Sequence, residues 1–326
     1  MYNVFIVDSA EAPHSSEIDV ESEALRGCAD VHLLVLDRES DFLPYAGEAD
    51  GIILWHHLRF GAELIARLAK TRIIVRNGVG YDNVDAAAAA ERGIAVSNVP
   101  DYGTEEVADH AVTLALALVR QLRPLMEDTG RGKWEWRTAA PCRRVRELAF
   151  GVVGCGRIGT ATALRAKALG FQARFFDPYL ASGYDKAIGV PRVDSLNGLL
   201  EASDIVSLHV PLTDETHRMI DAAQFERMKS TAYLVNTARG AIVRHDALVE
   251  ALAAGKIAGA GLDVLECEPE GIEAITRFPN CIVTPHSAFY SQESMVELRR
   301  KSALTVRDAL AEGKFRNVVN QPVKEV

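Results

Sequence analysis

Residues 148–180, LAFGVVGCGRIGTATALRAKALGFQARFFDPYL, constrain the fold more than any other part of the chain. Gly154, Gly156 and Gly159 follow an apolar strand-like run and open a helix-like run, in the spacing G-x-G-x-x-G. In a strand–turn–helix unit these glycines allow a tight turn, a close approach of pyrophosphate to the backbone, and close packing of helix on strand. The N-terminus of the helix then offers unpaired N–H groups to phosphates. The segment therefore predicts a dinucleotide-binding unit.

An acidic residue in the right place supports this interpretation. Asp177 ends the next strand-like run, ARFFD, and lies 18 residues beyond Gly159. A carboxylate at that position can bind both hydroxyls of a ribose. The glycine triplet alone is also found in ordinary turns, but strand, turn, helix, strand and acid in this order favour a dinucleotide site. Because the carboxylate would repel a 2′-phosphate, we predict NAD rather than NADP.

The rest of the chain alternates strand-like and helix-like runs. Before residue 100 the strand-like runs are NVFIVD, DVHLLVL, DGIILWH, RIIVRN and GIAVSNV. A long helix-like stretch at 104–122 precedes a second series: LAFGVVG, ARFFD, DIVSLHV, AYLVNTA, AGAGLDV and CIVTPH. The chain closes on another helix-like stretch, 293–313. Such alternation predicts parallel sheets with helices on both faces.

We therefore expect the α/β class, with two doubly wound parallel-sheet domains. The expected NAD-binding domain, of the Rossmann type, covers residues 103–290. It is inserted in a flavodoxin-like substrate domain formed by residues 1–102 and 291–326. No repeat of twenty to fifty residues is visible, which argues against a solenoid.

Composition narrows the class of protein. A formal net charge of −9 argues against nucleic acid as the main partner. The five cysteines have no paired spacing, so we expect neither a disulfide framework nor a bound metal. The apolar run at 111–119 is far shorter than the roughly 20 residues of a membrane span, and acidic residues come too early for a signal peptide. We expect a soluble, cytoplasmic protein with no membrane partner.

Three later strand-like runs end in residues that could reduce a carbonyl together with NAD. LVNTARG ends at Arg239, GLDVLECEP leads to Glu268, and IVTPH ends at His286. An arginine fork can hold a carboxylate, and a glutamate beside a histidine favours its charged, proton-donating form. Each residue alone is more typical of an ordinary surface or loop position. At successive strand ends of an expected NAD domain, they favour an acid–base site.

The motifs GCGRIG, FFDPYL, LHVPLTDETHRMI, LVNTARGAIV, AGAGLDVLECEP and VTPHSAFYS resemble the D-isomer-specific 2-hydroxyacid dehydrogenase family. Within that family the chain is most similar to the C-terminal-binding-protein (CtBP) branch. The resemblance runs in order from about residue 50 to 315 and covers the first fifty residues only in general pattern. It implies an NAD-dependent enzyme that transfers hydride between nicotinamide and C2 of a 2-oxo or 2-hydroxy acid.

The resemblance also implies roles for residues at matching positions. Arg239 would hold the substrate, His286 would exchange the proton, and Glu268 would orient His286. The substrate contacts would include Arg76, the backbone N–H groups of Gly78, Val79 and Gly80, and Phe289. The cofactor contacts would be Thr104, Gly154, Gly156, Arg157, Ile158, Gly159, Asp177, His209, Val210, Thr216, Thr237, Ala238 and Asp263. The segment 120–147 lies where the family forms its dimer, so a homodimer is expected.

Two departures and two alternatives accompany the resemblance. Glu147 replaces a glycine usual before the first cofactor strand, and Arg244 stands where the family often has an acid. Aromatic residues around Trp55 and Phe289 suggest a substrate larger than glyoxylate, although they are equally compatible with packing. An NAD-sensing, CtBP-like scaffold with weak dehydrogenase activity remains an alternative, as does phosphite (phosphonate) oxidation.

Overall fold

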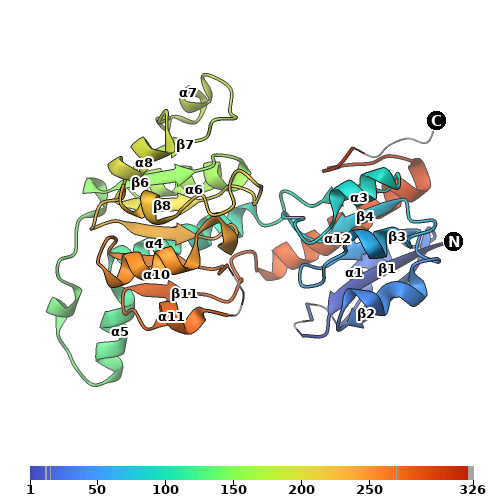
Figure 1. Ribbon diagram of the computed structural model, residues 1–326, viewed down its shortest axis with the longest axis horizontal. Coiled ribbons are helices and arrows are strands. Elements are labelled where there is room, and N and C mark those ends of the chain that lie inside the picture. The colour runs from blue at the N-terminus through green and yellow to red at the C-terminus, as the bar shows by residue number, and fades with distance from the viewer. Residues whose placement is uncertain (12, 15, 267, 269, 322–326) are drawn as a thin grey trace. The chain divides into compact units, whose positions relative to one another are not determined.

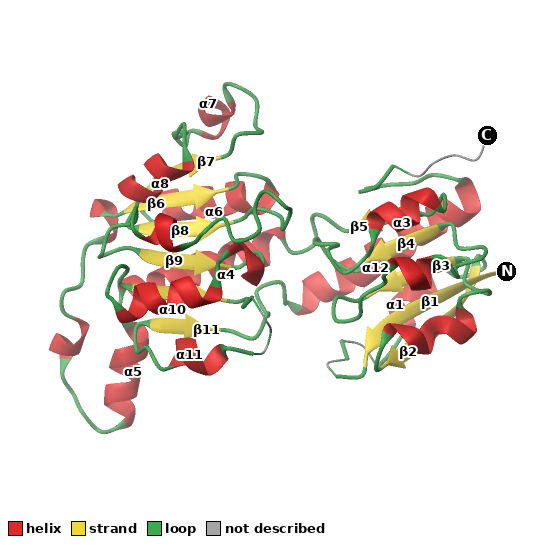
Figure 2. Cartoon of the chain, viewed as in Figure 1, coloured by secondary structure: helices red, strands yellow, loops and turns green. Residues whose placement is uncertain are grey.

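The computed structural model describes residues 1–11, 13, 14, 16–266, 268 and 270–321, and divides the chain into two compact units. The first unit comprises Met1–Gly103 and the C-terminal segment from Ser291, and the second comprises Thr104–Tyr290. Figure 1 labels the elements of both units and Figure 2 distinguishes their helices and strands. Each unit has a parallel sheet with helices packed on it, which confirms the expected α/β class.

The first unit has a five-stranded sheet in the order β2-β1-β3-β4-β5, with parallel pairing throughout. This is the flavodoxin-like order. Its strands are β1 (Tyr2–Ser9), β2 (Ala29–Leu36), β3 (Gly51–Leu54), β4 (Ile73–Arg76) and β5 (Ala95–Asn98). Its helices are α1 (Asp19–Ala24), η1 (Glu39–Tyr45), α2 (Ala62–Ile65), α3 (Ala86–Glu91) and α12 (Gln292–Glu312).

The last helix, α12, completes the core of the first unit. It packs on α1, β3 and β4 (Figure 2). A methyl group added at Gly51 would lie 2.8 Å from Cγ1 of Val306, so the small residue in β3 lets the helix approach the sheet closely. β3 and β4 are buried along their whole length, as expected for central parallel strands covered on both faces.

The second unit has a six-stranded parallel sheet in the order β11-β10-β9-β8-β6-β7. A single parallel bridge from Phe175 to Arg192 stands beyond β7, where the six-stranded Rossmann order places its third strand. The strands are β6 (Ala149–Val153), β7 (Gln172–Phe176), β8 (Ile205–Leu208), β9 (Tyr233–Asn236), β10 (Gly259–Leu262) and β11 (Cys281–Val283).

Helices lie on both faces of this second sheet (Figure 2). They are α4 (Thr104–Val119), α5 (Leu122–Gly130), η2 (Trp136–Ala139), η3 (Val145–Glu147), α6 (Arg157–Ala168), α7 (Tyr184–Ile188), α8 (Leu196–Ala202), α9 (Ala222–Phe225), η4 (Gly240–Ile242), α10 (His245–Ala253) and α11 (Ile272–Thr276). One hydrophobic cluster packs α4 and α6 on the sheet, and another packs α8 and α10. In this sheet the strand order reverses between β6 and β8, which makes a topological switch next to the glycine-rich turn.

The predicted long helix at 104–122 is shorter in the structure. α4 ends at Val119, and Gln121 adopts a left-handed conformation with φ of 53°. A new helix, α5, then begins at Leu122, so Pro124 lies in its first turn instead of following the end of the first helix. Proline is tolerated there because the first N–H groups of a helix have no intrahelical partner.

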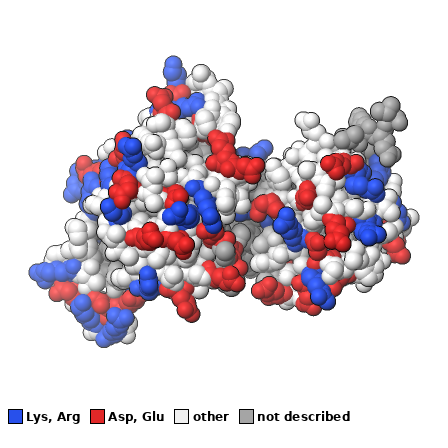
Figure 3. Space-filling view, in the orientation of Figure 1, with Lys and Arg blue, Asp and Glu red and all other residues white. Residues whose placement is uncertain are grey.

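The surface of each unit carries side chains of both charges (Figure 3). On the face seen in Figure 3, acidic and basic side chains are interspersed over each unit, and no continuous basic stripe is visible among the residues drawn in colour. Among the described residues, no helix combines the length and apolar character that crossing a membrane requires.

Candidate active site and cofactor site

The glycine-rich turn between β6 and α6 requires glycine at two positions for packing. Gly154 has φ of 83°, and a methyl group there would lie 2.7 Å from Cγ1 of Val210. A methyl group at Gly159 would lie 1.9 Å from the carbonyl oxygen of Gly154. At Gly156, by contrast, an added methyl group would meet no atom within 4 Å among the described residues beyond its neighbours in the chain. The third glycine thus closes the turn onto the helix, while Gly156 leaves space above the N-terminus of α6.

Asp177 lies beside this turn, directly after β7. Its carboxylate accepts hydrogen bonds from the backbone N–H groups of Cys155 and Tyr179, both at 2.9 Å. These bonds fix the carboxylate next to the glycine-rich turn and leave its remaining lone pairs for ribose hydroxyls. The geometry matches what the sequence pattern requires of an acid at this strand end.

The other predicted cofactor residues begin helices of the second unit or follow strands of its sheet. Thr104 begins α4, and Arg157 and Ile158 begin α6. The remaining positions come after β8, β9 and β10: His209, Val210, Thr216, Thr237, Ala238 and Asp263. Because the carboxyl ends of parallel strands meet at one edge of the sheet, the topology brings these residues to the edge that carries the glycine-rich turn.

The polar groups and the open space at this edge fit a dinucleotide. The buried hydroxyl of Thr237 has no hydrogen-bond partner among the described residues, and buried polar groups of this kind are normally satisfied. Burial lowers the pKa of the His209 imidazole to about 3, so this ring is neutral at physiological pH. Its Nε2 lies 2.8 Å from the Ser207 hydroxyl. An orphaned hydroxyl and open space above a helix N-terminus suit a ligand rich in hydroxyl and phosphate oxygens.

Asp263 anchors the loop that carries His286. Its buried carboxylate accepts hydrogen bonds from the Thr284 hydroxyl at 2.6 Å and from the backbone N–H groups of Ser287 and Ala288 at 2.9 Å. The backbone N–H of His286 also donates to the carbonyl oxygen of Asp263 at 2.9 Å. These bonds hold His286 with φ of 51°, a conformation that is uncommon for a residue other than glycine. The sequence placed Asp263 among cofactor contacts and did not reveal this anchoring.

His286 and Glu268 form a hydrogen-bonded pair in the second unit. Nδ1 of His286 lies 2.9 Å from Oε2 of Glu268, and the other carboxylate oxygen accepts from the Leu265 N–H at 3.1 Å. Burial alone would raise the pKa of Glu268, but the hydrogen bond and positive charge of His286, the Leu265 N–H and the charge of Arg239 together lower it. Glu268 is therefore ionised at neutral pH, and its carboxylate accepts a hydrogen bond from Nδ1 of His286.

Arg239 stands at the end of β9, immediately before η4. Its Nη1 donates to the carbonyl oxygen of Ala238 at 2.8 Å, and its own carbonyl oxygen accepts from the Asn236 side chain at 2.9 Å. A methyl group at the next residue, Gly240, would lie 1.8 Å from the Leu265 carbonyl oxygen, so the glycine lets this turn approach the Glu268 loop. The charge of Arg239 accordingly acts on Glu268. The second unit thus brings the three predicted catalytic residues together.

Phe289 and the predicted substrate loop occupy different units. The ring of Phe289 lies 6.3 Å from that of His286, edge to face, in the second unit. In the first unit, Arg76 is buried at the end of β4 and donates to the Asn77 carbonyl oxygen at 3.0 Å.

The backbone after Arg76 is shaped by the guanidinium itself. A methyl group at Gly78, where φ is 145°, would lie 1.5 Å from Nη1 of Arg76. The N–H of Gly78 donates to the Arg76 carbonyl oxygen at 2.9 Å, while the carbonyl oxygen of Val79 accepts from the Asn98 side chain at 2.6 Å. Of the three amides predicted for an anion, that of Gly78 is therefore already engaged, and Gly80 follows in the same turn.

Comparison with known proteins assigns the chain to a family. The model of the D-isomer-specific 2-hydroxyacid dehydrogenase NAD-binding domain matches residues 112–288. The glyoxylate reductase of Korarchaeum cryptofilum is 41% identical over 270 residues, which are 81% of this chain and 81% of that protein. This chain belongs to the D-isomer-specific 2-hydroxyacid dehydrogenase family. The expected resemblance is confirmed.

Two further relatives show the range of the family. C-terminal-binding protein 1 of Caenorhabditis elegans is 35% identical over 272 residues, which cover 81% of this chain but 37% of that protein. A further relative is the NADPH-dependent glyoxylate/hydroxypyruvate reductase from Sinorhizobium meliloti, whose structure was solved in complex with NADP and malonate. It is 29% identical to this chain, with a TM-score of 0.85, and the match covers 100% of this chain and 99% of that one. The family member described here is an NAD(P)-dependent oxidoreductase of 2-hydroxy or 2-oxo acids.

Proposed function

We propose that the chain is an NAD-dependent D-2-hydroxyacid dehydrogenase that reduces a small 2-oxo acid. The hydrogen-bonded pair of His286 and Glu268, in the unit that carries the glycine-rich turn, is the observation that carries this proposal. When bound, the nicotinamide supplies or accepts the hydride. The residues of the chain supply substrate binding, orientation and the proton.

The proposed roles follow from the side-chain chemistry. Arg239 polarises the carbonyl and holds the carboxylate of the substrate, since its charge is fixed and its fork is planar. His286 donates a proton from Nε2 to the carbonyl oxygen as C2 accepts hydride, and the product is the 2-hydroxy acid. Glu268 stabilises the protonated imidazole before this transfer. In the first unit, Arg76 and the turn at residues 78–80 are proposed to contact the substrate carboxylate.

The test of the acid–base role is His286→Ala. We expect kcat to fall by about 10²–10⁴-fold, the usual contribution of a positioned general acid, while the Kd for NADH stays near that of the wild type. Equilibrium binding of NADH by fluorescence separates the two effects. Turnover within a few-fold of the wild type would remove His286 from the mechanism.

The choice of NAD rests on Asp177. Its carboxylate, fixed beside the glycine-rich turn, favours ribose hydroxyls and repels a 2′-phosphate. The proposal requires a higher kcat/KM with NADH than with NADPH. Scaffolding of the CtBP kind and phosphite oxidation are not favoured by any feature of the site.

A homodimer is proposed from the segment 120–147. Trp134 and Trp136 in this segment are 93% and 71% exposed, and two exposed indoles close in sequence are typical of a surface that another chain covers. Figure 1 shows α5 and the loop after it extending from the body of the second unit. Sedimentation of the protein at micromolar concentration should give the mass of a dimer. A monomer under those conditions would contradict the proposal.

A further inference from the structure

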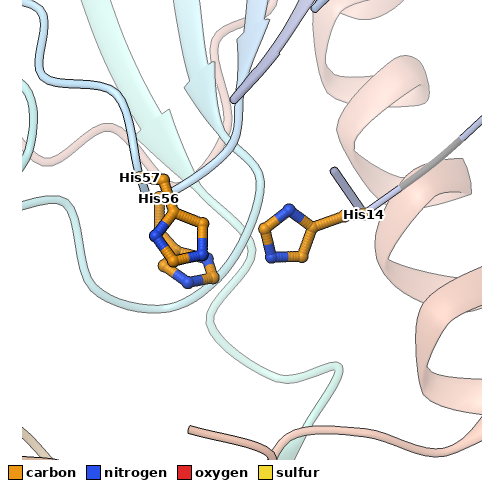
Figure 4. Close-up of side chains that lie close together, drawn as sticks. All are labelled: His14, His56 and His57. Carbon is orange, nitrogen blue, oxygen red and sulfur yellow. The ribbon is translucent and has the colours of Figure 1, made fainter. Parts of the chain in front are cut away.

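Three histidines from two loops of the first unit lie together at one edge of its sheet (Figure 4). His14 lies in the loop after β1, and His56 and His57 follow β3. One ring nitrogen of each lies within 4.8 Å of those of the other two. β1 and β3 are parallel neighbours, so their carboxyl ends bring the two loops to the same edge. The proposed reaction assigns no role to these histidines.

The ring of His14 is oriented by two contacts. Its Nδ1 lies 2.9 Å from Oδ1 of Asp8, a fully buried residue near the end of β1, and its backbone N–H donates to Oδ2 at 2.6 Å. The ring also stacks on buried Trp55, with centroids 4.3 Å apart and planes 7° from parallel. Because a carboxylate only accepts, Nδ1 donates its hydrogen to Asp8, and in the neutral ring Nε2 carries the lone pair. A carboxylate behind an imidazole is the usual means of orienting a histidine that binds a metal.

The other two rings complete a compact set of nitrogen ligands. The centroids of His56 and His57 are 4.0 Å apart, and that of His14 lies 4.6 Å from His56 and 5.3 Å from His57. A neutral imidazole binds a metal ion through one ring nitrogen. Imidazole nitrogen is a preferred ligand of Zn²⁺ and of other divalent transition metals.

We propose that His14, His56 and His57 bind one divalent transition-metal ion, with Zn²⁺ as the first candidate, and that Asp8 orients His14 behind it. Zn–N bonds of about 2.0–2.1 Å place tetrahedral ligand atoms about 3.4 Å apart, so modest side-chain rotations close the set. His57 is exposed and has room for such a rotation. Three protein ligands leave one position for water or an anionic oxygen. The bound ion would join the loop after β1 to the loop after β3.

The experiment uses the full-length protein without a histidine tag, freed of metal by a chelator. Titration with Co²⁺ is followed by visible absorption, and titration with Zn²⁺ by calorimetry. We expect one equivalent of either ion to bind, and Zn²⁺ to abolish the Co²⁺ bands. Asp8→Asn should weaken Zn²⁺ binding by about 10–100-fold, the usual effect of losing an orienting partner. His57→Ala removes a ligand at an exposed position and should weaken it further. NADH turnover is not the readout, so this test is independent of the proposed reaction.

The matched control is His32→Ala, which removes an exposed imidazole from β2 of the same unit. Its metal affinity should equal that of the wild type. The proposal is overturned if the wild type shows no saturable binding, or if His57→Ala binds Zn²⁺ as tightly as the His32 variant does. Inorganic phosphate that binds in place of the metal, and loses affinity in the same variants, would instead identify an anion site and also overturn it.

Discussion

Glu268→Gln isolates the charge of the partner of His286. Glutamine keeps the size of the side chain and an oxygen that can accept from Nδ1, but it removes the negative charge that favours the protonated imidazole. The low pKa of Glu268 means that this charge is present throughout the neutral range. The substitution should therefore change the rate of reduction more than the structure of the loop.

The size of the effect follows from the 2.9 Å contact between Nδ1 and Oε2. The side chains of His286 and Glu268 are 25% and 35% exposed, so the interaction is partly screened by water. Coulomb's law at this distance, with the dielectric constant of water, gives about 1.4 kcal/mol as a lower limit. That energy corresponds to a factor of about ten in rate. Because the proposed proton donor is the cationic ring, kcat/KM for reduction should fall at least about tenfold.

The assay is kcat/KM for reduction between pH 5 and pH 10, with NADH as the hydride donor. Glu266→Gln is the matched control, since it removes the same charge from the same loop, where Glu266 pairs with Arg218 at 2.6 Å. The control should leave kcat/KM near that of the wild type. An equal loss of kcat/KM in both variants, or no loss in Glu268→Gln, would refute the assigned role of the pair.

Four other substitutions test the cofactor site and the charge state of its residues. Gly156→Ala should leave the melting temperature unchanged in thermal unfolding but weaken NADH binding at least about tenfold in a fluorescence titration. Gly159→Ala should destabilise the fold by about 1–3 kcal/mol, as measured by thermal unfolding. Asp177→Ser should lower kcat/KM with NADH roughly 10–100-fold, while kcat/KM with NADPH stays equal or rises. An unchanged ratio of kcat/KM for NADH to kcat/KM for NADPH would contradict the ribose contact. The imidazole of folded His209 has a pKa of about 3, whereas the unfolded imidazole takes up a proton below about pH 6.5. Protonation of the unfolded state at this group should therefore lower the free energy of unfolding by about 2 kcal/mol between pH 6.5 and pH 5. In chemical denaturation, the free energy of unfolding of His209→Gln should depend less on pH than that of the wild type, by this amount. The same pH dependence in both proteins would contradict the burial of a neutral ring.

Much of the fold could be predicted from local sequence signals. Apolar β-branched runs between helix-like runs predicted both parallel sheets, and the spacing of Gly154, Gly156 and Gly159 predicted the turn onto α6. The break at Gln121 was not predicted, because a left-handed glutamine has no sequence signature and Pro124 was interpreted as a stop signal.

Site residues that directly follow a strand could be predicted from the sequence, whereas contacts that depend on tertiary packing could not. Arg239, Glu268 and His286 each follow a strand-like run, so parallel topology alone brings them to one edge. The anchoring by Asp263 depends on hydrogen bonds across two loops, which no spacing encodes. The histidine cluster was missed for the same reason, since two helices and two strands separate His14 from His56 in the chain. The expectation of no metal came from the cysteine pattern.

The proposed reaction is the reduction of a 2-oxo acid with NADH. Its most direct test is the initial rate of NADH oxidation by the purified protein with glyoxylate, hydroxypyruvate, pyruvate, phenylpyruvate and longer aliphatic 2-oxo acids. We predict rapid turnover of one or a few of these, with a preference set by side chains such as Phe289 beside His286. Tight binding of NADH with negligible turnover of every member of the panel would contradict it.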